Sequence, residues 1–310
     1  MPMLKMEQFE KRTLLPMLFY ESAPFDSNEF IYELKFDGIR CFAYLDNNRT
    51  TLINKRGKDV SQTYPELLLI HQNIKKSCLL DGELVIMING KPNFYELQRR
   101  SLLLNSFKIK LAANKYPLIF VVFDILIIGD DLIIDKPLME RKKILQENII
   151  ESPQLVISRF NEANGKSFFE LAKAHDLEGI VAKEKFSRYY PGKRSRSWLK
   201  IKVYQEDDLI ICGYVPSQLG IKKLILGTYN QNKDLVYVTT VLTSKDKKNI
   251  MEFARKHPGP PLFNSNDEII WMQPHLVGIV RYMMKTKAKG LRQPVFIGLR
   301  LDKVAKDLKN

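Results

Sequence analysis

The chain has 310 residues, and its 49 Lys and Arg against 35 Asp and Glu give a formal net charge of +14. Hydrophobic residues make up 45% and charged residues 27% of the chain, which excludes a disordered, fibrous or membrane-embedded protein. The length exceeds the roughly 250 residues at which a single core stops growing, so we expect two domains, and the positive charge predicts a polyanionic partner.

Short runs of β-branched and apolar residues, bounded by turn residues, predict strands in the first two thirds of the chain. These runs cover residues 31–36, 40–45, 50–54, 79–88, 118–128, 179–183 and 198–203. Helices are predicted between them at 94–104, 137–149 and 167–175, the second with a proline in its first turn. The order of these elements is a mixed α+β pattern and lacks the regular β-α-β alternation of a doubly wound sheet.

The pattern changes after residue 203. The acidic run Glu206, Asp207 and Asp208 predicts a hinge. Beyond it, a small β-barrel is indicated by short strands at 209–214, 223–229 and 235–240, a helix at 245–256 and later strands near 269 and at 276–284. We therefore expect one domain over residues 1–203 and a second, a barrel of the OB type, over residues 204–310.

The cysteines and histidines indicate neither disulfides nor a metal centre. Cys41, Cys78 and Cys212 are odd in number and form no C-x-x-C pair, and the four histidines lack metal-ligand spacing. The amino terminus carries charges in every turn up to Arg12, unlike a signal peptide, and the longest apolar run, 118–128, is too short to span a bilayer. We expect a monomeric cytoplasmic protein that does not contact a membrane.

One octet, residues 33–40, combines a lysine, a turn and an arginine. Asp37 and Gly38 stand between two alternating runs and predict a hairpin with Lys35 and Arg40 at its mouth. A lysine that is desolvated or lies beside other cations has a lowered pKa and becomes a usable nucleophile. Taken alone, the octet fits a surface hairpin with incidental charges better than a catalytic site.

Charged side chains recur on three other predicted strands, as Asp81 with Glu83, as Glu178, and as Lys200 with Lys202. Period-two alternation places the two carboxylates of the first strand together on a face that points away from the core. It places the two lysines of the last strand on one face together with Trp198, opposite Leu199 and Ile201. A solvated edge strand would show the same pattern as the lysine pair. The order of these segments along the chain is more specific than any one of them.

Six segments stand in the order of the motifs of covalent nucleotidyltransferases: KFDGIR at 35–40, DGE at 81–83, FD at 123–124, EGIVAK at 178–183, WLKIK at 198–202 and RLDK at 300–303. Over residues 33–303 the chain resembles the ATP-dependent DNA ligases. The segments FYELQRR at 94–100, YPGKRSRSWLKIK at 190–202 and LRQPVFIGLRLDK at 291–303 look like the ligase module of bacterial non-homologous end-joining enzymes. The resemblance implies a nucleotidyltransferase (adenylation) domain of antiparallel sheets with helices, followed by a small OB-fold β-barrel domain.

The resemblance also implies a reaction in three steps and a set of site residues. Lys35 attacks the α-phosphate of ATP and pyrophosphate leaves, AMP passes to a DNA 5′-phosphate, and the 3′-hydroxyl displaces AMP. Family positions near the nucleotide are Glu33, Arg40, Lys55, Arg56, Glu83, Phe123, Glu178, Lys183, Lys200 and Lys202. The ligands expected for Mg²⁺ or Mn²⁺ are Glu83 and Glu178, and the residues expected to orient pyrophosphate are Arg300 and Lys303.

Four of these residues carry open questions. Where the family usually has Ser-Arg-Asn-Gly, this chain has NKRG at 54–57, so the arginine role belongs either to Lys55 or to Arg56. Lysine cannot reproduce a bidentate guanidinium contact. Phe123 fits either a ring stacked on adenine or a core phenylalanine among apolar neighbours. A straight strand places Lys183 on the face opposite the carboxylate that begins its motif.

Two basic stretches predict the contact with DNA. Residues 183–202 hold eight Lys or Arg and one acidic residue, and residues 281–303 hold seven and one. Aromatic residues lie among them, as is typical of surfaces that follow a phosphate backbone, and no element that reads bases is evident. The DNA contacts expected are Arg188, Lys193, Arg194, Arg196, Lys287, Lys289 and Arg292.

The expected partner is nicked or broken duplex DNA, which would make the protein nucleoid-associated when bound. By resemblance, a Ku ring and a separate end-processing polymerase or nuclease are further partners, while a base-excision or backup repair role fits the residues equally. Two alternatives are an RNA ligase and an mRNA-capping guanylyltransferase, which share the lysine nucleophile; segments 190–202 and 291–303 favour DNA ligase. A third is a non-catalytic OB-type nucleic-acid-binding adaptor, against which the intact motif residues argue.

Overall fold

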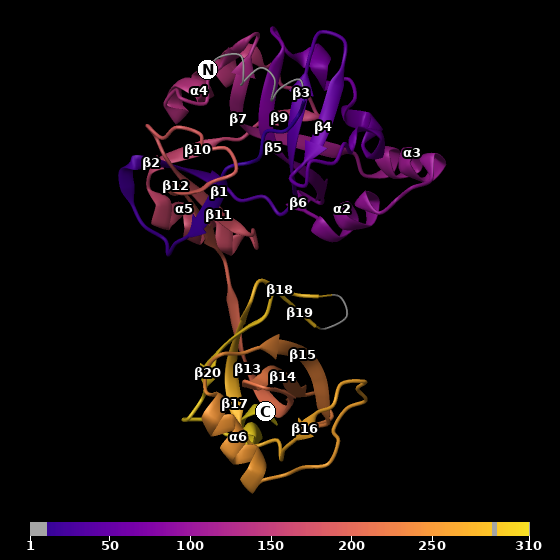
Figure 1. The fold of residues 1–310 in the computed structure, drawn as a ribbon, viewed down its shortest axis with the longest axis vertical. Coiled ribbons are helices and arrows are strands. Elements are labelled where there is room, and N and C mark those ends of the chain that lie inside the picture. The colour runs from indigo at the N-terminus through magenta and orange to yellow at the C-terminus, as the bar shows by residue number, and fades with distance from the viewer. Residues whose placement is uncertain (1–10, 287–289, 310) are drawn as a thin grey trace. The chain divides into compact units, whose positions relative to one another are not determined.

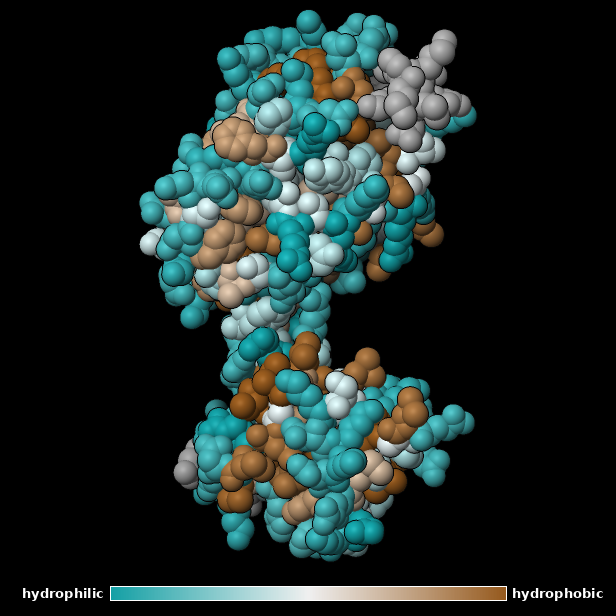
Figure 2. All heavy atoms as spheres, turned by 60° about the vertical axis from the view of Figure 1, so that its left-hand side comes forward, coloured by the Kyte–Doolittle hydropathy of each residue, from teal (hydrophilic) through white to brown (hydrophobic). Residues whose placement is uncertain are grey.

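The computed structural model describes residues 11–286 and 290–309, and the chain divides into two compact units, Met1–Val203 and Tyr204–Asn310 (Figure 1). Hydrophilic side chains cover much of the face of each unit seen in Figure 2. Lys287 and Lys289, both predicted to contact DNA, lie outside the described residues. Within the described ranges, no helix is long and apolar enough to cross a membrane.

Two sheets form the N-terminal unit. The first has the strand order β1-β12-β11-β2-β10, and the second has the path β4-β3-β5-β7-β8, with β6 beside β5 and β9 beside β7. The first sheet consists of β1 (Leu18–Glu21), β2 (Ser27–Leu34), β10 (Phe160–Ala163), β11 (Gly179–Glu184) and β12 (Arg194–Lys202). The second consists of β3 (Ile39–Leu45), β4 (Thr50–Asn54), β5 (Cys78–Ile88), β6 (Lys91–Pro92), β7 (Leu118–Ile128), β8 (Asp131–Leu132) and β9 (Leu155–Ile157).

Helices connect these strands: α2 (Phe94–Ser101), α3 (Ser106–Lys115), α4 (Leu138–Asn148) and α5 (Gly165–Ala174), with 3₁₀ turns η1 (Ser61–Thr63), η2 (Pro65–Leu67) and η3 (Ile70–Asn73). The prediction of one helix over 94–104 is wrong at its end, because α2 stops at Ser101 and α3, which the sequence did not predict, follows. The cause is local. The Asn105 side chain accepts a hydrogen bond from the Lys108 backbone N–H and so caps a new helix.

The central strand β5 is buried on both faces. Leu80 belongs to one core cluster, whereas Leu79 belongs to a second cluster that also contains Ile31 of β2 and Trp198 of β12. The second cluster therefore joins the facing sides of the two sheets. The expectation that Asp81 points away from the core is wrong, because this second cluster covers that face of β5 and the Asp81 side chain is fully buried.

The predicted hairpin at Asp37 and Gly38 is also wrong. β2 lies in the first sheet and β3 in the second, so this turn crosses from one sheet to the other. A glycine is needed at the crossing, because a Cβ on Gly38 would lie 2.6 Å from Cγ of Glu83 and still closer to the Leu84 carbonyl oxygen. The close approach holds the segment that carries Lys35 against β5.

The C-terminal unit is a curved sheet with the strand order β15-β14-β13-β17-β20, with β16 beside β13, and a separate two-stranded ribbon of β18 and β19. β15 and β20, at the two ends of this order, are in contact. The elements are β13 (Gln205–Ser217), β14 (Gly220–Tyr229), β15 (Leu235–Leu242), α6 (Lys247–Lys256), β16 (Ile270–Trp271), β17 (Val277–Tyr282), β18 (Met284–Lys285), β19 (Leu291–Arg292), β20 (Val295–Leu299) and η4 (Ala305–Lys309). The predicted α+β class is confirmed.

The acidic run at the start of this unit is not a hinge. Glu206, Asp207 and Asp208 lie within β13, where they pair with β17. Their charges are matched across the sheet, since Nε of Arg281 is 2.9 Å from Glu206 Oε1 and Nζ of Lys285 is 2.8 Å from Asp207 Oδ2. Acidic residues in sequence suggested a solvated linker, but cations opposite them allow a regular strand.

Candidate active site

Lys35, the nucleophile expected from the sequence, lies directly after β2 and contacts a carboxylate. Its Nζ is 2.7 Å from Oε2 of Glu178, the residue that precedes β11. The Lys35 backbone N–H also donates to the Gly179 carbonyl at 3.0 Å. Gly179 has φ +138°, and a Cβ there would collide with the Ile201 carbonyl oxygen. The glycine of this motif therefore permits the backbone bend that carries Glu178 to Lys35.

A second carboxylate, Glu83 of β5, lies near the same lysine. The pKa of Glu83 is raised to about 8, chiefly by burial and also by Glu178 and Asp81, against the opposing effect of Lys35 and Arg40. Burial likewise raises the pKa of Glu178, and Lys35 opposes that shift. Two buried carboxylates with raised pKa values would be stabilised in their ionised forms by a divalent cation between them.

Glu33 of β2 is buried and held by two lysines. Its Oε1 is 2.5 Å from Nζ of Lys142, and its Oε2 is 3.0 Å from Nζ of Lys183. The Ser158 hydroxyl donates to Oε2 at 3.1 Å. Burial raises the pKa of Glu33, but the two lysines outweigh burial and lower it overall. Glu33 is therefore an ionised anchor for Lys183.

Lys183 of β11 lies between two aromatic rings. Its Nζ is 4.1 Å from the ring centroid of Phe123 and 4.2 Å from that of Trp198. Burial lowers the pKa of Lys183 to about 8, although Glu33 attracts the charge. Phe123 is half-buried and packs against the cluster between the sheets. The Phe123 ring therefore lies on the side of β7 that faces the first sheet, where Lys183 is, and not in the core cluster on the other face of the second sheet.

The expectation from a straight strand, that Lys183 lies on the face opposite Glu178, does not hold. Lys183 contacts Glu33, and Glu178 contacts Lys35. The side chains of Lys183 and Glu178 therefore both reach the end of β2, where residues 33 and 35 are alternate positions. The expectation carried a regular alternation from Glu178 to Lys183. The positive φ of Gly179 interrupts that alternation at the start of β11.

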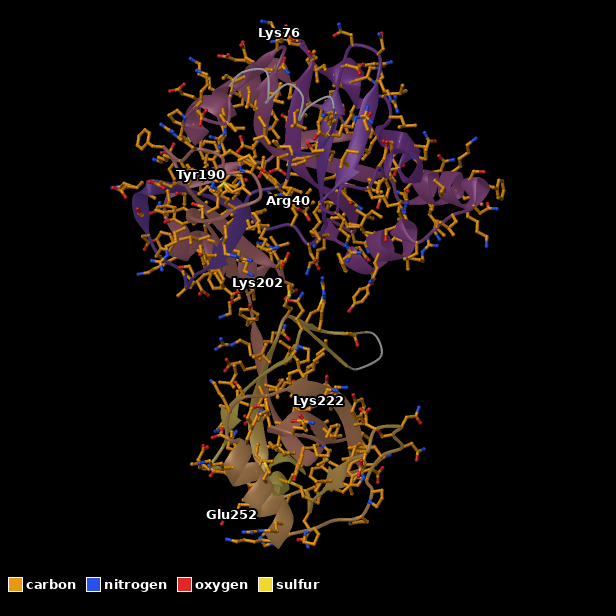
Figure 3. All side chains as sticks on the ribbon, viewed as in Figure 1. Arg40, Lys76, Tyr190, Lys202, Lys222 and Glu252 are labelled. Atoms are coloured by element: carbon orange, nitrogen blue, oxygen red, sulfur yellow. The ribbon has the colours of Figure 1, made fainter. Side chains whose placement is uncertain are left out.

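Arg40 of β3, which is labelled in Figure 3, makes hydrogen bonds with a buried carboxylate. Its Nε and Nη2 donate to the two carboxylate oxygens of Asp81 at 3.0 and 2.6 Å. The Tyr189 hydroxyl donates to Asp81 at 2.7 Å. The guanidinium lies 5.4 Å from the Phe123 ring centroid, so Asp81 holds it close to that ring.

The alternation predicted for β12 is confirmed. Trp198 lies in the cluster between the sheets, whereas Leu199 and Ile201 pack on the opposite side. Burial lowers the pKa of Lys202; Glu178 opposes this shift, and Lys200 and Lys35 add to it. Three lysines thus share one neighbourhood, as a polyphosphate site requires.

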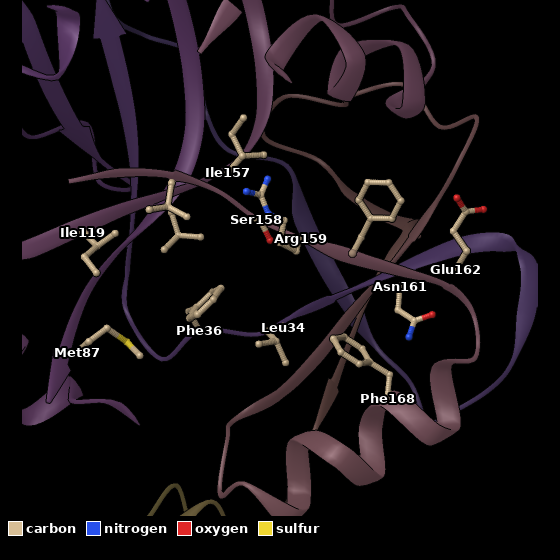
Figure 4. Close-up of a pocket in the computed structure, with 13 residues that line it drawn as sticks. Leu34, Phe36, Met87, Ile119, Ile157, Ser158, Arg159, Asn161, Glu162 and Phe168 are labelled. Atoms are coloured by element: carbon tan, nitrogen blue, oxygen red, sulfur yellow. The ribbon is translucent and has the colours of Figure 1, made fainter. Parts of the chain in front are cut away.

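A cavity of 620 Å³ opens beside the Lys35 segment (Figure 4). Leu34 and Phe36, the residues on either side of Lys35 in the chain, line it together with Ile119 and Val121 of β7. Its walls are mostly apolar, with a few polar groups from residues 158–162. Cavities of this size and character are typical of small-molecule sites.

Other predicted residues lie on exposed turns and strand ends. Lys55 and Arg56 are exposed in the turn after β4, where the Asn54 side chain accepts a hydrogen bond from the Arg56 backbone N–H. The DNA candidates Arg188, Lys193, Arg194 and Arg196 are all exposed, and Arg292 is half-buried. These positions suit contact with a large ligand.

In the C-terminal unit, the motif cations Arg300 and Lys303 gather around one carboxylate. Nη1 of Arg300 is 3.1 Å from both carboxylate oxygens of Asp208, and Nζ of Lys303 is 2.7 Å from Asp208 Oδ2. Nε and Nη2 of Arg300 donate to the oxygens of Asp302 at 2.8 and 2.7 Å. These hydrogen bonds from Arg300 lower the pKa of Asp302 to about 2.

Three residues of these networks were missed from the sequence: Lys142, Tyr189 and Asp208. A signal for Lys142 existed. In α4, Leu138 and Leu145 are buried, and Lys142 occupies the same helical stripe at a spacing of four and three residues. A charged residue at a core position indicates a buried partner. Tyr189 and Asp208 had no comparable signal, because their partners are distant in sequence.

Two family models match the chain. The model described as ATP dependent DNA ligase domain matches residues 16–202, and the one described as ATP dependent DNA ligase C terminal region matches residues 217–303. The first alone covers more than half of the chain. The chain therefore belongs to the family of ATP-dependent DNA ligases, which are enzymes.

Curated relatives carry the same assignment. The chain is 31% identical over 286 residues to the SPbeta prophage-derived DNA ligase-like protein LigB of Bacillus subtilis, covering 91% of this chain and 97% of LigB. It is 28% identical over 312 residues to the multifunctional non-homologous end joining DNA repair protein LigD of Mycobacterium tuberculosis, covering 95% of this chain and 39% of LigD. The chain thus spans nearly all of the first relative and less than half of the second.

Solved structures agree on the fold. A mycobacterial DNA ligase D complexed with ATP and MES matches with a TM-score of 0.57 and 25% identity, covering 96% of this chain and 98% of that one. A Lig E DNA ligase matches with a TM-score of 0.61 at 14% identity, covering 92% and 99%, and supports the fold alone. The prediction of an ATP-dependent DNA ligase is confirmed, and the RNA ligase, capping-enzyme and adaptor alternatives are not favoured.

Proposed function

We propose that this ligase seals 5′-phosphate and 3′-hydroxyl ends in duplex DNA through a covalent AMP on Lys35. The observation that carries the assignment is the 2.7 Å contact between Lys35 Nζ and Glu178 Oε2 beside Glu83 and Lys202. Glu178 orients the amine and is within reach to accept its proton. The amine then attacks the α-phosphorus of ATP, and the bond to the oxygen that bridges to the β-phosphate breaks, releasing pyrophosphate.

The remaining residues between the sheets bind the nucleotide in this proposal. Lys200 and Lys202 neutralise the phosphates, and Phe123 offers its ring to the adenine. Arg40 and Lys183 each lie over that ring, and Glu33 reaches its surroundings through its contact with Lys183. The exposed pair Lys55 and Arg56 would contact either nucleotide or DNA phosphate, and their exposure supports a role toward a large ligand.

Glu83 and Glu178 fit a divalent metal. Burial raises the pKa of both carboxylates, and Glu178 further disfavours the ionised form of Glu83, as expected of a pair built around a cation. Among the described residues no cluster of three or more His, Cys, Asp or Glu side chains could hold a metal, so these two ligands would leave most positions to water and phosphate. Mg²⁺ or Mn²⁺ bound here would supply charge neutralisation for the phosphates.

The C-terminal unit is the OB-fold domain in this proposal, and residues 1–203 are the adenylation domain. The five-strand order of the curved sheet supports its assignment as a small barrel. Arg300 and Lys303 would orient the leaving pyrophosphate, while the exposed cations Arg188, Lys193, Arg194 and Arg196, with Arg292, would hold DNA. Lys287 and Lys289 remain sequence predictions for the same role.

The end-joining pathway is the proposed setting. The name of one relative, LigD, gives non-homologous end joining and DNA repair as the role of that protein, of which this chain spans 39%. Ku and a separate end-processing enzyme are the proposed partners, and a cytoplasmic, nucleoid-associated monomer is the proposed state.

Covalent adenylation tests the proposal directly. Incubation with ATP and Mg²⁺ should add the mass of AMP less water to the wild type and to Lys143→Ala, an exposed-lysine control, but not to Lys35→Ala. Lys35→Ala should still seal a nick whose 5′ end already carries AMP, because only the first step uses the nucleophile. Adduct formation by Lys35→Ala, or by wild type with GTP alone, would overturn the assignment.

A further inference from the structure

One acidic side chain, Asp208 of β13, holds both motif cations of the C-terminal unit. Its carboxylate accepts from Nη1 of Arg300 at 3.1 Å and from Nζ of Lys303 at 2.7 Å. Asp208 is 15% exposed, against 25% for Arg300 and 39% for Lys303, measured on the side chains. The anchor is thus more buried than the cations, which extend toward solvent from it.

The surrounding backbone fixes this anchor in place. Asp208 pairs with Ile279 in the ladder between β13 and β17, so the strand at the centre of the sheet sets its position. On the other side, the Arg300 backbone N–H donates to the Val277 carbonyl of β17 at 2.8 Å. Asp208 and Arg300 are therefore held against the same strand, and their side chains meet across it.

We infer that Asp208 is a positioning residue for lysine adenylation, which holds Arg300 and Lys303 at the spacing needed to bind the pyrophosphate of ATP. The inference rests on the proposed function, in which these two cations orient that leaving group. A carboxylate that touches both cations sets the distance between them. Long cationic side chains lose much rotamer freedom when they bind phosphate, so arranging them beforehand lowers the entropy cost of the transition state.

The alternative is that Asp208 only clips the segment after β20 to the sheet. A purely structural contact would stabilise the C-terminal unit, so its loss would affect all reaction steps alike. A positioning residue acts only where Arg300 and Lys303 act, which is the step that contains pyrophosphate. Step specificity therefore separates the two roles.

The test uses Asp208→Asn in the full chain, with Asp207→Asn as a matched control. Asp207 is the adjacent residue of the same strand and pairs with Lys285 at 2.8 Å, so the control removes an equivalent charge. At saturating ATP, Asp208→Asn should slow single-turnover lysine adenylation about tenfold to a hundredfold, with a smaller change in KM for ATP. Sealing of a pre-adenylated nick should stay within about twofold of wild type, and Asp208→Glu should recover part of the adenylation rate.

Coupling provides the second measurement. In a background of Arg300→Ala with Lys303→Ala, adding Asp208→Asn should change the adenylation rate by less than about twofold, because the residues through which it acts are gone. A full additional loss in that background would overturn the inference, as would equal losses in adenylation and in sealing.

The two proposals fail in different ways. If Arg300→Ala leaves adenylation intact, the pyrophosphate role in the proposed function fails, and the inference about Asp208 fails with it. If Arg300→Ala slows adenylation while Asp208→Asn does not, the proposed function stands and only the inference about Asp208 is wrong.

Discussion

The two units of the chain differ in how deeply their charged side chains are buried. Among the described residues, the charged side chains that are buried all belong to the N-terminal unit: Glu33, Asp81, Arg100, Asp124, Arg141, Lys142 and Lys183. In the C-terminal unit, the cluster of Asp208, Arg300 and Lys303 keeps between 15% and 39% of each side chain exposed. Among the described residues, the N-terminal unit thus has ion pairs buried inside it in addition to those at its surface, whereas the ion pairs of Asp208 stay partly exposed.

The difference matches the tasks proposed for the two units. A buried ion pair cannot lose one partner without leaving an uncompensated charge, so it holds neighbouring groups in one geometry. The N-terminal network thereby fixes Arg40 and Lys183 near the proposed nucleotide site. A partly exposed cluster leaves its cations open to solvent, which suits cations that must meet a phosphate in one step and leave it in another.

The largest effect is expected from breaking a buried pair. Asp124 and Arg141 are both fully buried, and Nε and Nη2 of Arg141 donate to the Asp124 carboxylate at 2.8 Å each. Asp124→Asn should destabilise the N-terminal unit by about 3–5 kcal/mol, because Arg141 keeps its charge without a counter-ion. Denaturant unfolding measures the change.

A surface pair provides the control for that experiment. Lys143 and Glu147 of α4 are 4.0 Å apart and mostly exposed, so Glu147→Gln should change stability by less than about 0.5 kcal/mol. Equal losses for Asp124→Asn and Glu147→Gln would mean that burial does not separate the two classes of ion pair.

The second effect concerns the motif cations of the C-terminal unit. Arg300→Ala and Lys303→Ala should each slow lysine adenylation by about tenfold to a thousandfold, the range for losing a group that stabilises developing charge. Phosphodiester formation on pre-adenylated DNA should suffer much less, since that step contains no pyrophosphate. Single-turnover assays of both steps distinguish these outcomes. Losses of the same size in each step would assign the pair to DNA binding or to domain stability.

Sequence alone predicted the strands and the alternation within them well where local rules apply. The pairing of Lys200 with Lys202 on the face of Trp198 follows from period-two alternation, and the structure has it. Fold class and family also followed, because several motifs in a fixed order are far more specific than any one motif. What remained hidden depends on contacts between residues distant in sequence.

Two errors show why. The Asp37–Gly38 pair has the composition of a hairpin turn, yet the strands on either side join different sheets, which no local pattern reveals. Glu206 to Asp208 looked like a solvated hinge because the cations that pair with Glu206 and Asp207 are distant in sequence. Arg281 lies 75 residues after Glu206, and Lys285 pairs with Asp207. In both cases tertiary pairing decided the outcome over local composition.

A third prediction extends the comparison to the surface of the N-terminal unit. Arg194 and Arg196 on β12 are exposed and lie 5.6 and 6.0 Å from the Tyr20 ring centroid. Changing both to glutamine should weaken binding to nicked DNA for all sequences alike and reduce the slope of log affinity against log salt by about 0.9 per lost phosphate contact. Titrations at several salt concentrations measure this. A slope equal to that of wild type would show that the two arginines are only a solvated face.

The smallest effect is expected from a buried charge that titrates. Burial holds the pKa of Lys183 at about 8, below its ordinary value of 10.5, so between these values the folded protein binds fewer protons at this residue than the unfolded chain. Stability from this group therefore rises as pH increases through that window, by about 1 kcal/mol between pH 8 and 9. Lys183→Met should lack the rise, whereas Lys143→Met, which replaces an exposed lysine, should follow the wild type. Urea unfolding of the three proteins across this range provides the measurement. Parallel curves of unfolding free energy against pH for wild type and Lys183→Met would show that the pKa of Lys183 is not lowered in the folded protein.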